Sequence, residues 1–401
     1  MKVFVVNCGS SSIKYQLFDM TDESVLGRGV LERLGTGHAR LHHTADGTTR
    51  EMSVAADDHT AGMKMIVEML VDPKTGVLSS IDEVEGVGHR VVHGAEEITE
   101  SRLIDEQLLA VIRRNVELAP LHNPPNLAGI EAASAAMPNA PHVAVFDTAF
   151  LTTLPPVAYR YAVPEQWYAK HHVRRYGFHG TSHRYVTLRA AELLGKPVEK
   201  VNLITAHLGN GCSMTAIAGG VAVDHSMGMT PLEGLIMGTR SGDVDPAIVL
   251  YMISRGLSAE EVDRAMNNSS GLLGVSQCSN DMRDVLAAAD KGNPKAALAV
   301  EMFAYRVAKY VGAYHAILPA VDAVVLTGGI GENSVPVRRA ICRRLVGLGV
   351  VGDQQRNDQT VGGKDGPITA AGSAMPVWVV PTNEELMIAR DTRQVLAGTD
   401  G

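Results

Sequence analysis

Cysteines and long apolar runs are scarce in this sequence. The four cysteines lie far apart and form no C-x-x-C pair, which disfavours both a disulfide framework and a zinc ribbon. No stretch reaches the roughly 18 apolar residues of a transmembrane helix, and the apolar run at residues 3–6 is too short for the core of a secretory signal. We therefore expect a cytoplasmic protein without a membrane partner.

Basic residues are also in the minority. Lys and Arg number 36 against 44 Asp and Glu, a net charge of −8, and no long basic run occurs. A nucleic-acid partner needs a basic surface, so none is expected. The 45% hydrophobic and 20% charged residues are typical of a folded protein, and 401 residues at ~150 residues per domain predict two or three domains.

Glycine, by contrast, is present in excess. The chain has 40 glycines without the Gly-X-Y period of collagen, and ordinary usage is about 7%. Glycine is useful where a chain turns tightly or where a ligand approaches the backbone. The excess therefore indicates many tight turns or close approaches.

Two segments of the chain share one plan. FVVNCGSSSIKYQLF at residues 4–18 and LITAHLGNGCSMTAI at residues 203–217 each join an apolar strand to a returning strand through a short turn of small polar residues. Further strands are predicted at residues 142–146, 220–223, 322–327 and 377–381. The weak identity leaves duplication open, but the pattern favours two related α/β domains around a cleft.

Helices are predicted between these strands from apolar periodicity and capping residues. They are expected over residues 61–71, 105–118 and 294–318, after Pro124, from Thr181 to just before Gly195, after the capping box of Ser258 and Glu261, from Ser334, and from about Glu384.

Three small-residue turns follow apolar strands, at residues 7–12, 207–211 and 328–333. Backbone amides that converge in such turns bind anions. Each turn alone is also typical of an ordinary hairpin, but three together favour a nucleotide. A complete G-x-G-x-x-G fingerprint and a Walker A sequence are both missing, so a dinucleotide is disfavoured and the nucleotide would be held by separate loops.

Four other residues are candidates for chemistry. Arg90 and Arg240 stand in glycine-containing segments and could clamp a carboxylate or phosphoryl group, or form structural ion pairs. Asp147 follows a buried strand and could position metal or substrate, or cap a turn. His179 and His183 have an i, i+4 spacing, but without a further ligand zinc is disfavoured and His179 is better interpreted as a donor to developing charge.

Together these segments resemble the acetate kinase family. The motifs are NCGSSSIK (7–14), HRVVHG (89–94), LHNPPN (121–126), FDTAF (146–150), RRYGFHGTSH (174–183), HLGNG (207–211), GTRSGDVDP (238–246), GGIGEN (328–333) and PTNEE (381–385). The resemblance covers almost the whole chain and is weakest at residues 28–58 and 351–374.

The resemblance implies the duplicated actin-like ATPase fold, βββαβαβα in each domain, with an active site between the domains (ribonuclease H-like). It places the N-terminal domain at residues 1–150, with a C-terminal helix at about 384–398 packing back on it. The second domain, at residues 151–383, would bind nucleotide and form a homodimer. The implied reaction is reversible, direct in-line transfer of the γ-phosphoryl group of ATP to acetate, giving acetyl phosphate and ADP, with Mg²⁺ or, in its place, Mn²⁺.

The resemblance also assigns residues. Asn7 and Glu384 would hold the metal, and Arg90, Asp147, His179 and Arg240 would be catalytic. Nucleotide would contact Ser10, Ser12, Lys14, His207, Leu208, Gly209, Asn210, Gly211, Asp281, Met282, Arg283, Gly329, Ile330, Gly331, Glu332 and Asn333. Acetate would lie against Arg90, Val92, Leu121, His122, Phe178 and Pro231, with propionate a weaker substrate.

The chemistry agrees with these residue types. A carboxylic acid with a pKa near that of Glu, ~4.3, is ionised at neutral pH and needs no strong base. What it needs is cationic stabilisation of two anions that repel each other. We therefore expect Asp147 to orient the metal rather than accept a proton.

Two positions depart from the family pattern. Cys8 stands where alanine is usual, and Ala95 stands where a second glycine is common. Because Cys8 lies in the first small-residue turn, alkylation that reaches it is expected to inhibit, with protection by ATP. The alternatives to an acetate kinase are a propionate or butyrate kinase, an actin-like or chaperone-like ATPase, and a nicotinamide oxidoreductase.

Overall fold

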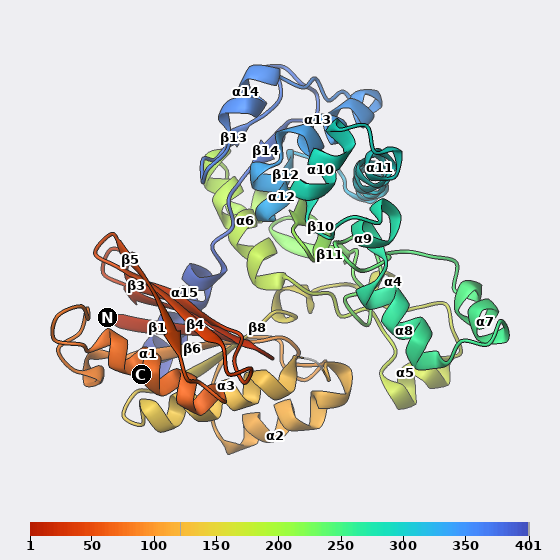
Figure 1. Cartoon of the computed structure of the whole chain (residues 1–401). Helices are drawn as coiled ribbons and strands as arrows, with labels where there is room; N and C mark the ends of the chain where they lie inside the picture. The colour runs from red at the N-terminus through yellow and green to blue at the C-terminus, as the bar shows by residue number, and fades with distance from the viewer. Residues whose placement is uncertain (121, 400–401) are drawn as a thin grey trace. The chain divides into compact units, whose positions relative to one another are not determined.

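The computed structural model describes residues 1–120 and 122–399, except for the side chain of Thr399. The chain divides into two compact units (Figure 1). Unit 1 consists of Met1–Phe150 and the C-terminal segment that starts at Asn383, and unit 2 consists of Leu151–Thr382. Each unit is built on its own sheet.

Unit 1 contains an eight-stranded sheet in the order β5-β4-β3-β2-β1-β6-β8-β7. The strands are β1 (Lys2–Gly9), β2 (Ser12–Asp19), β3 (Ser24–Glu32), β4 (Ala39–Ala45), β5 (Thr48–Val54), β6 (Gly86–Val91), β7 (Arg102–Leu103) and β8 (His142–Phe146). Strands β1 to β5 form antiparallel hairpins, whereas β1, β6 and β8 are parallel. The carboxyl ends of these three parallel strands therefore meet at one edge.

Helices cover both faces of this sheet. They are α1 (His59–Leu70), η1 (Ile81–Glu83), α2 (Glu106–Arg114), η2 (Asn115–Leu118), α3 (Asn123–Ala136), α15 (Glu384–Thr399) and η3 (Ala149–Leu151), which crosses the unit boundary. Because side chains alternate along a strand, Phe4, Val6 and Cys8 of β1 point to the core shared with α1 and α3. The intervening residues face α15.

Helix α15 lies unusually close to the sheet. A Cβ at Gly86 would be 2.7 Å from Leu396, and a Cβ at Gly88 would overlap Thr392. Both glycines lie on β6, on the face that α15 covers. Part of the glycine excess thus allows this close helix-to-sheet packing.

Unit 2 contains a six-stranded sheet in the order β11-β10-β9-β12-β14-β13. The strands are β9 (Leu203–Leu208), β10 (Cys212–Ala218), β11 (Val221–His225), β12 (Ala323–Thr327), β13 (Gly366–Pro367) and β14 (Val377–Val379). The helices are α4 (Pro156–Tyr159), α5 (Glu165–His171), α6 (Gly180–Leu193), η4 (Val198–Lys200), α7 (Ala247–Ser254), α8 (Ala259–Asn268), α9 (Gly271–Ser276), α10 (Met282–Asp290), α11 (Pro294–Ile317), α12 (Gly328–Asn333), α13 (Val335–Arg344), η5 (Val346–Leu348) and α14 (Gln354–Gln359).

The two sheets share one topology, which confirms the predicted duplication. Order β3-β2-β1-β6-β8 of unit 1 corresponds to β11-β10-β9-β12-β14 of unit 2, with the same parallel and antiparallel pairings. The final helices are exchanged: α6 follows β8 in the sequence but packs on β9 and β12, and α15 follows β14 but packs on β1, β6 and β8.

Some predictions differ from the structure in detail. The first turn is only Ser10-Ser11, because Asn7 to Gly9 continue β1 and Ser12 begins β2. Residues 328–333 form helix α12 rather than a turn. The strands β3, β4 and β5 lie in the region where the resemblance is weakest and were not predicted. Among the described residues no helix is both long and apolar enough to span a membrane.

Candidate active site

Three polar side chains of unit 1 meet at the carboxyl edge of its parallel strands. Arg90 is opposite Val145 in the β6–β8 register, and Asp147 follows two residues later on the same face. Continuing the β1–β6 register by one residue places Asn7 beside Arg90. All three are on the face covered by α15, whose first residue is Glu384. Asn7, Arg90, Asp147 and Glu384 are called the Arg90 cluster below.

An ion pair organises the Arg90 cluster. Arg90 Nη2 contacts Asp147 Oδ2, and Nη1 lies 3.4 Å from Asn7 Oδ1. The Asp147 side chain is 2% exposed and that of Arg90 is 20% exposed. Burial opposes the charge of Arg90, but the carboxylates of Asp147 and Glu384 raise its pKa above the ordinary value. The buried Arg90 Nε has no hydrogen-bond partner within the described residues, so it can still donate to an anion.

The surroundings of Glu384 disfavour the ionised form of its carboxyl group. Burial, and then the like charge of Asp147, raise its pKa to about 7, although Arg90 opposes this shift. A bound cation would remove the repulsion between the carboxylates. The oxygen donors of Asn7 and Glu384 are of the kind that Mg²⁺ prefers, so the predicted metal ligands fit that ion.

This metal site would be only partly formed by protein. In the part of the chain that the structure describes, no group of three or more His, Cys, Asp or Glu side chains is arranged to hold a metal ion. Mg²⁺ commonly uses one or two protein carboxylates and completes its shell with water and substrate phosphates. The sparse donor set therefore agrees with a metal that arrives with a nucleotide.

The first hairpin lies beside this cluster. Lys14 pairs with Asn7 across β1 and β2 and is exposed, as is Ser10 in the turn, whereas Ser12 is partly buried. Cys8, by contrast, points to the opposite face, where a Cβ on Gly129 of α3 would overlap its Sγ. Burial raises the pKa of the Cys8 thiol to about 12. The thiol is therefore buried and protonated, which disfavours its reaction with alkylating reagents. The inhibition expected if a reagent does reach Cys8 stays a prediction.

Two asparagines of α3 hold the strand ends in place, and sequence reasoning did not single them out. Asn126 accepts a hydrogen bond from Val92 N at 3.0 Å and donates to Cys8 O at 2.8 Å. Asn123 accepts from His93 N at 3.3 Å and donates to His93 O at 3.2 Å. Both are buried. The available signal was a pair of asparagines flanking two prolines in LHNPPN.

In unit 2, His179 stands at the start of α6 in a strained conformation. Its φ of 59° and ψ of 25° are left-handed, which is costly for a residue other than glycine. Its Nδ1 lies 2.9 Å from Ser213 Oγ, and its ring stacks on His207 with centroids 4.4 Å apart. His207 Nδ1 lies 2.8 Å from Ser182 Oγ. The strand β9, its hairpin partner β10 and α6 thus fix both imidazoles.

Arg240 approaches the same place from the loop after β11. A Cβ on Gly211 would lie 3.3 Å from His179 Nε2 and 3.7 Å from Arg240 Nη1, which explains why the second hairpin turn needs glycine there. Arg240 Nη1 donates to Pro231 O at 3.3 Å, and burial lowers the pKa of the guanidinium. Within the described residues Arg240 has no carboxylate partner.

The hairpin turn is joined to that loop. Gly238 N donates to Asn210 O at 2.9 Å, and Asn280 Nδ2 donates to Asn210 Oδ1 at 3.2 Å. A Cβ on Gly238 would overlap Asn210 Oδ1. His179, His207, Asn210 and Arg240 are called the His179 cluster below.

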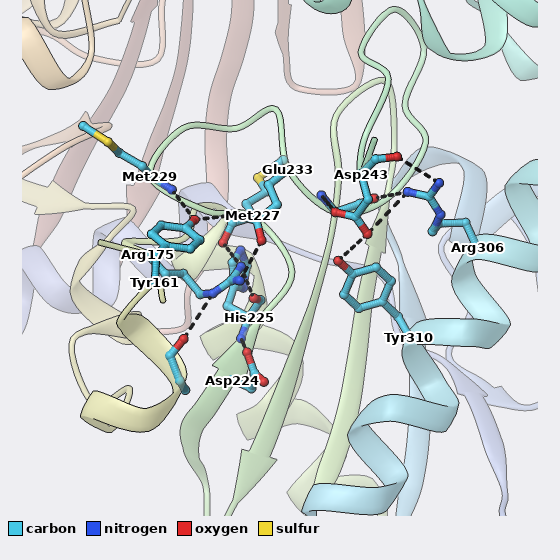
Figure 2. A network of polar contacts seen from close by, with 12 residues as sticks. Tyr161, Arg175, Asp224, His225, Met227, Met229, Glu233, Asp243, Arg306 and Tyr310 are labelled. Atoms are coloured by element: carbon cyan, nitrogen blue, oxygen red, sulfur yellow. Dashed lines mark hydrogen bonds and ion pairs between the residues drawn. The ribbon is translucent and has the colours of Figure 1, made fainter. Parts of the chain in front are cut away.

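The loop that carries Arg240 is anchored by two partly buried networks (Figure 2). In the first, Arg175 Nη1 donates to His225 O at 2.7 Å and to Met227 O at 2.8 Å, and Nη2 donates to Glu233 Oε1 at 2.7 Å. The hydroxyl of Tyr161 donates to the other oxygen of Glu233. This network fixes the beginning of the loop.

The second network fixes the end of the loop, as Figure 2 shows. Asp243 accepts from Gly234 N at 2.7 Å and from Tyr310 Oη at 2.8 Å. Arg306 of α11 donates to Gly234 O at 2.7 Å and to Asp243 O at 3.2 Å. Because both ends are tied to the body of unit 2, Arg240 is presented on a rigid loop. GTRSGD thus contains an anchor, Asp243, as well as Arg240.

Helix α12 carries the GGIGEN segment, and its ends are held by charged side chains. Glu332 Oε1 accepts from Gly328 N at 2.9 Å and from Thr382 N at 3.1 Å, so this carboxylate ties α12 to the chain after β14. Arg338 is fully buried and donates to the carbonyl oxygens of Gly331 and Asn357 at 3.2 and 2.6 Å. Burial lowers the pKa of Arg338 to about 10.

The remaining residues predicted to contact nucleotide have mixed environments. Gly329 and Asn333 are exposed, Ile330 is partly buried, and Leu208 and Gly331 are buried; Gly209 lies in the hairpin turn. Asp281 caps α10 by accepting from Arg283 N at 2.8 Å, and hydrogen bonds from the Arg283 guanidinium and backbone lower the Asp281 pKa to about 2. Arg283 is exposed, whereas Met282 is buried.

The residues predicted to contact acetate are divided between the units. Val92 in unit 1 and Phe178 in unit 2 are each 4% exposed. His122 and Pro231 are partly buried, and Leu121 lies outside the described residues.

Known proteins resemble this chain over its full length. A family model described as the acetokinase family matches residues 2–390. An acetate kinase of Thermotoga petrophila is 51% identical over 99% of each chain. Among solved structures, Porphyromonas gingivalis acetate kinase is 46% identical with a TM-score of 0.94, covering 98% of this chain and 99% of that one. A propionate kinase of Francisella tularensis is 40% identical with a TM-score of 0.92 and the same coverage.

Proposed function

The chain belongs to the acetokinase family, and from that premise we propose that it transfers the γ-phosphoryl group of ATP to acetate, reversibly and in line, giving acetyl phosphate and ADP. The Arg90 cluster is the observation that carries the proposal. It presents a guanidinium, whose buried Nε has no hydrogen-bond partner among the described residues, beside an aspartate and a glutamate. The positive charge of this guanidinium would reduce the repulsion between acetate and the γ-phosphate of ATP, two anions that must approach each other.

In unit 1, Arg90 would bind the carboxylate of acetate or the phosphoryl group in flight. A guanidinium offers parallel donors that match either anion. Asp147 holds the guanidinium in position and has a side chain only 2% exposed, so its geometry is set before substrate binds. Lys14, Ser10 and Ser12 would contact nucleotide phosphates from the neighbouring hairpin.

Mg²⁺ would be held by Asn7 and Glu384, and when bound it would neutralise charge on the nucleotide phosphates. Asp147 would orient the metal's surroundings rather than accept a proton, because acetate is already ionised. Support comes from the raised pKa of Glu384, which follows from burial and from the nearby Asp147 carboxylate.

In unit 2, His179 and Arg240 would stabilise charge on the transferring phosphoryl oxygens. Both approach Gly211, and Arg240 has a rigid loop and lacks a carboxylate partner within the described residues. The hairpin residues His207 to Gly211 would contact phosphate. Adenosine would lie against residues 281–283 and the GGIGEN helix α12.

Side-by-side assays of acyl-hydroxamate formation with acetate, propionate and butyrate test the reaction and its substrate. We expect acetate to be used best and propionate less well, since one methylene changes discrimination by only ~1–3 kcal/mol. The proposal fails if all three acids are inactive with ATP and Mg²⁺ or Mn²⁺. A preference for propionate would instead favour the activity named for the Francisella tularensis relative.

The metal assignment has its own test. Glu384→Gln and Asn7→Ala are expected to raise the Mg²⁺ concentration for half-maximal activity, with the larger effect at Glu384 because it removes a charge. Glu385→Gln is the matched control on the same helix. Equal Mg²⁺ dependence in all three variants and the parent protein would contradict the assignment.

A homodimer through unit 2 is the proposed assembly. Helix α7 supports it: in this fully described helix no side chain is buried, although its sequence is AIVLYMIS. Leu250 and Tyr251 are 71% and 61% exposed, and such apolar surfaces are typical of subunit interfaces. Light scattering should give twice the chain mass, and Leu250→Glu should give monomer. A monomeric parent protein would refute the assembly.

A further inference from the structure

A chain of hydrogen bonds runs from His179 into the core of unit 2. Its Nδ1 lies 2.9 Å from Ser213 Oγ, which lies 2.7 Å from His183 Nε2. His183 Nδ1 lies 2.7 Å from Thr205 Oγ1, and the Thr205 hydroxyl donates to Thr215 O at 3.4 Å. Ser213, His183 and Thr205 are fully buried. These three residues therefore find their hydrogen-bonding partners inside the protein.

The hydrogen bond at Thr205, the end of the series farthest from His179, fixes the direction of donation along the series. A carbonyl oxygen can only accept, so the single hydrogen of the Thr205 hydroxyl is committed to Thr215 O. Thr205 Oγ1 must then accept from His183 Nδ1. A neutral His183 with its proton on Nδ1 accepts at Nε2, so Ser213 donates to it. Ser213 Oγ can in turn only accept from His179, whose Nδ1 therefore carries a hydrogen.

The surroundings of His183 keep its imidazole neutral. Burial, and then the neighbouring His225 and His207, lower its pKa well below the ordinary value. His225 is also fixed: its Nε2 accepts from Phe178 N at 3.1 Å, so its Nδ1 donates to Thr215 Oγ1 at 2.9 Å.

We propose that this chain places the proton of neutral His179 on Nδ1, so that Nε2 can donate to the transferring phosphoryl group only when His179 is an imidazolium. His179 then acts as a cation, and Ser213, His183 and Thr205 are positioning residues. The inference rests on the proposed role of His179 in phosphoryl transfer and specifies its charge.

The ionisable groups near His179 include two histidines and an arginine. His207 of β9 stacks on its ring, His183 of α6 is reached through Ser213 of β10, and Arg240 approaches from the loop after β11. The charge of Arg240 opposes protonation of His179, whereas the phosphates of bound ATP favour it. The cationic form is therefore expected in the nucleotide complex, and kcat should fall as pH rises through the His179 titration.

Nitrogen NMR of the intact protein tests the proton position directly. Histidine is labelled with ¹⁵N, the His179 signals are assigned by their loss in His179→Gln, and long-range proton–nitrogen correlations are recorded on the alkaline side of its titration. The neutral ring should be protonated on Nδ1. A neutral ring protonated on Nε2 overturns the proposal, whatever the protein's substrate proves to be.

The pH dependence of kcat for acetate phosphorylation gives a second test. Ser213→Ala removes the acceptor for Nδ1–H, and a charge-assisted hydrogen bond is roughly twice as strong as a neutral one, so the alkaline limb should move to lower pH by about 0.5 to 1 unit. Thr187→Val is the matched control, because it removes a buried hydroxyl of α6 that, within the described residues, donates to His183 O and to no member of this hydrogen-bonded series. Coincident alkaline limbs in Ser213→Ala and the parent protein would overturn the proposal. If the parent protein has no acetate kinase activity, the proposed function is rejected, and the NMR experiment alone then tests the proton position on His179.

Discussion

The Arg90 cluster and the His179 cluster occupy equivalent edges of two sheets with one topology, yet they use different chemistry. The register of β1 and β6 places Asn7 beside Arg90, and the register of the equivalent strands β9 and β12 pairs His207 with Thr327. His207 thus corresponds to Asn7, and Thr327 corresponds to Arg90. One strand further, Arg90 is opposite Val145, and the β12–β14 register continues to Thr327 opposite Val380.

The next polar position in each unit extends this correspondence. Asp147 and Thr382 each follow two residues beyond the paired strand position. Where unit 1 has the Arg90–Asp147 ion pair, unit 2 has Thr382 Oγ1 bonded to Ser182 Oγ at 2.8 Å. One scaffold therefore supports the Arg90–Asp147 ion pair in unit 1 and a pair of hydroxyl groups at the equivalent position of unit 2, where the guanidinium of Arg240 comes from the loop after β11.

The largest expected effect is at that loop. Arg240→Ala should lower kcat by about 10³-fold, since one cation at the transferring phosphoryl group supplies effects of this size. Stability should change little, because the described residues leave Arg240 without a carboxylate partner. Arg240→Lys is the control and should restore only part of the rate. A decrease in kcat of less than tenfold for Arg240→Ala in steady-state assays would show that Arg240 does not contact the transferring phosphoryl group.

Asp147→Asn should give the next largest effect and should differ in kind. It leaves the Arg90 guanidinium without its charged partner, so we expect kcat to fall about 10²-fold and the free energy of unfolding to fall by about 2 kcal/mol. Thr382→Val, at the equivalent position of unit 2, should lower both kcat and the free energy of unfolding by less than Asp147→Asn does. Near-normal turnover with unchanged Mg²⁺ affinity in Asp147→Asn would contradict the proposed role, and equal effects of both substitutions would break the comparison.

Arg338→Met sharpens the comparison within unit 2. It leaves buried carbonyls at the end of α12 without donors, which should cost about 3 kcal/mol of unfolding free energy. It should also raise KM for ATP severalfold without changing KM for acetate. Chemical denaturation and initial-rate kinetics measure these quantities. Equal increases in both KM values would show that α12 is not specific to the nucleotide.

The smallest effect is expected at Ala95, five residues after Arg90 in the sequence. Its φ of 54° is left-handed, where a Cβ costs about 1–2 kcal/mol. Ala95→Gly removes that cost but adds about 0.5–1 kcal/mol of unfolded-state entropy, so a gain near 0.5 kcal/mol is expected. Thermal unfolding measures it, with Ala136→Gly in α3 as a destabilising control. Destabilisation by Ala95→Gly would mean that the strain is absent.

Sequence reasoning predicted the two hairpins, the parallel strands β8, β12 and β14 and the long helices, because each has clear periodicity or capping residues. It missed β3, β4 and β5, the parallel strand β6 and the two-residue strands β7 and β13. Strand β4, ARLHHTA, does alternate buried and less buried residues, but Leu41 is the one large apolar side chain among its inward positions, which otherwise hold alanine and histidine. A sheet edge with one face on solvent gives only this weak signal.

The candidate site was predicted as separate motifs, and the structure supplies the links between some of them. Strand register joins Asn7, Arg90 and Asp147, which are far apart in the sequence. The chain of hydroxyls behind His179 was not predictable, because Ser213 and Thr205 look like ordinary strand residues. Only the fold brings them into contact with His183.

The exchange of α6 and α15 has a consequence for how the polypeptide is made. Helix α15 is the last element in the chain, but it packs against Gly86 and Gly88 of β6, which is made much earlier. A nascent chain on the ribosome therefore presents its first sheet with one face uncovered until the C-terminus is released. The second sheet already has α6 when its strands emerge. The sheet that is made first is thus completed last, and deletion of α15 would leave one face of the unit 1 sheet uncovered.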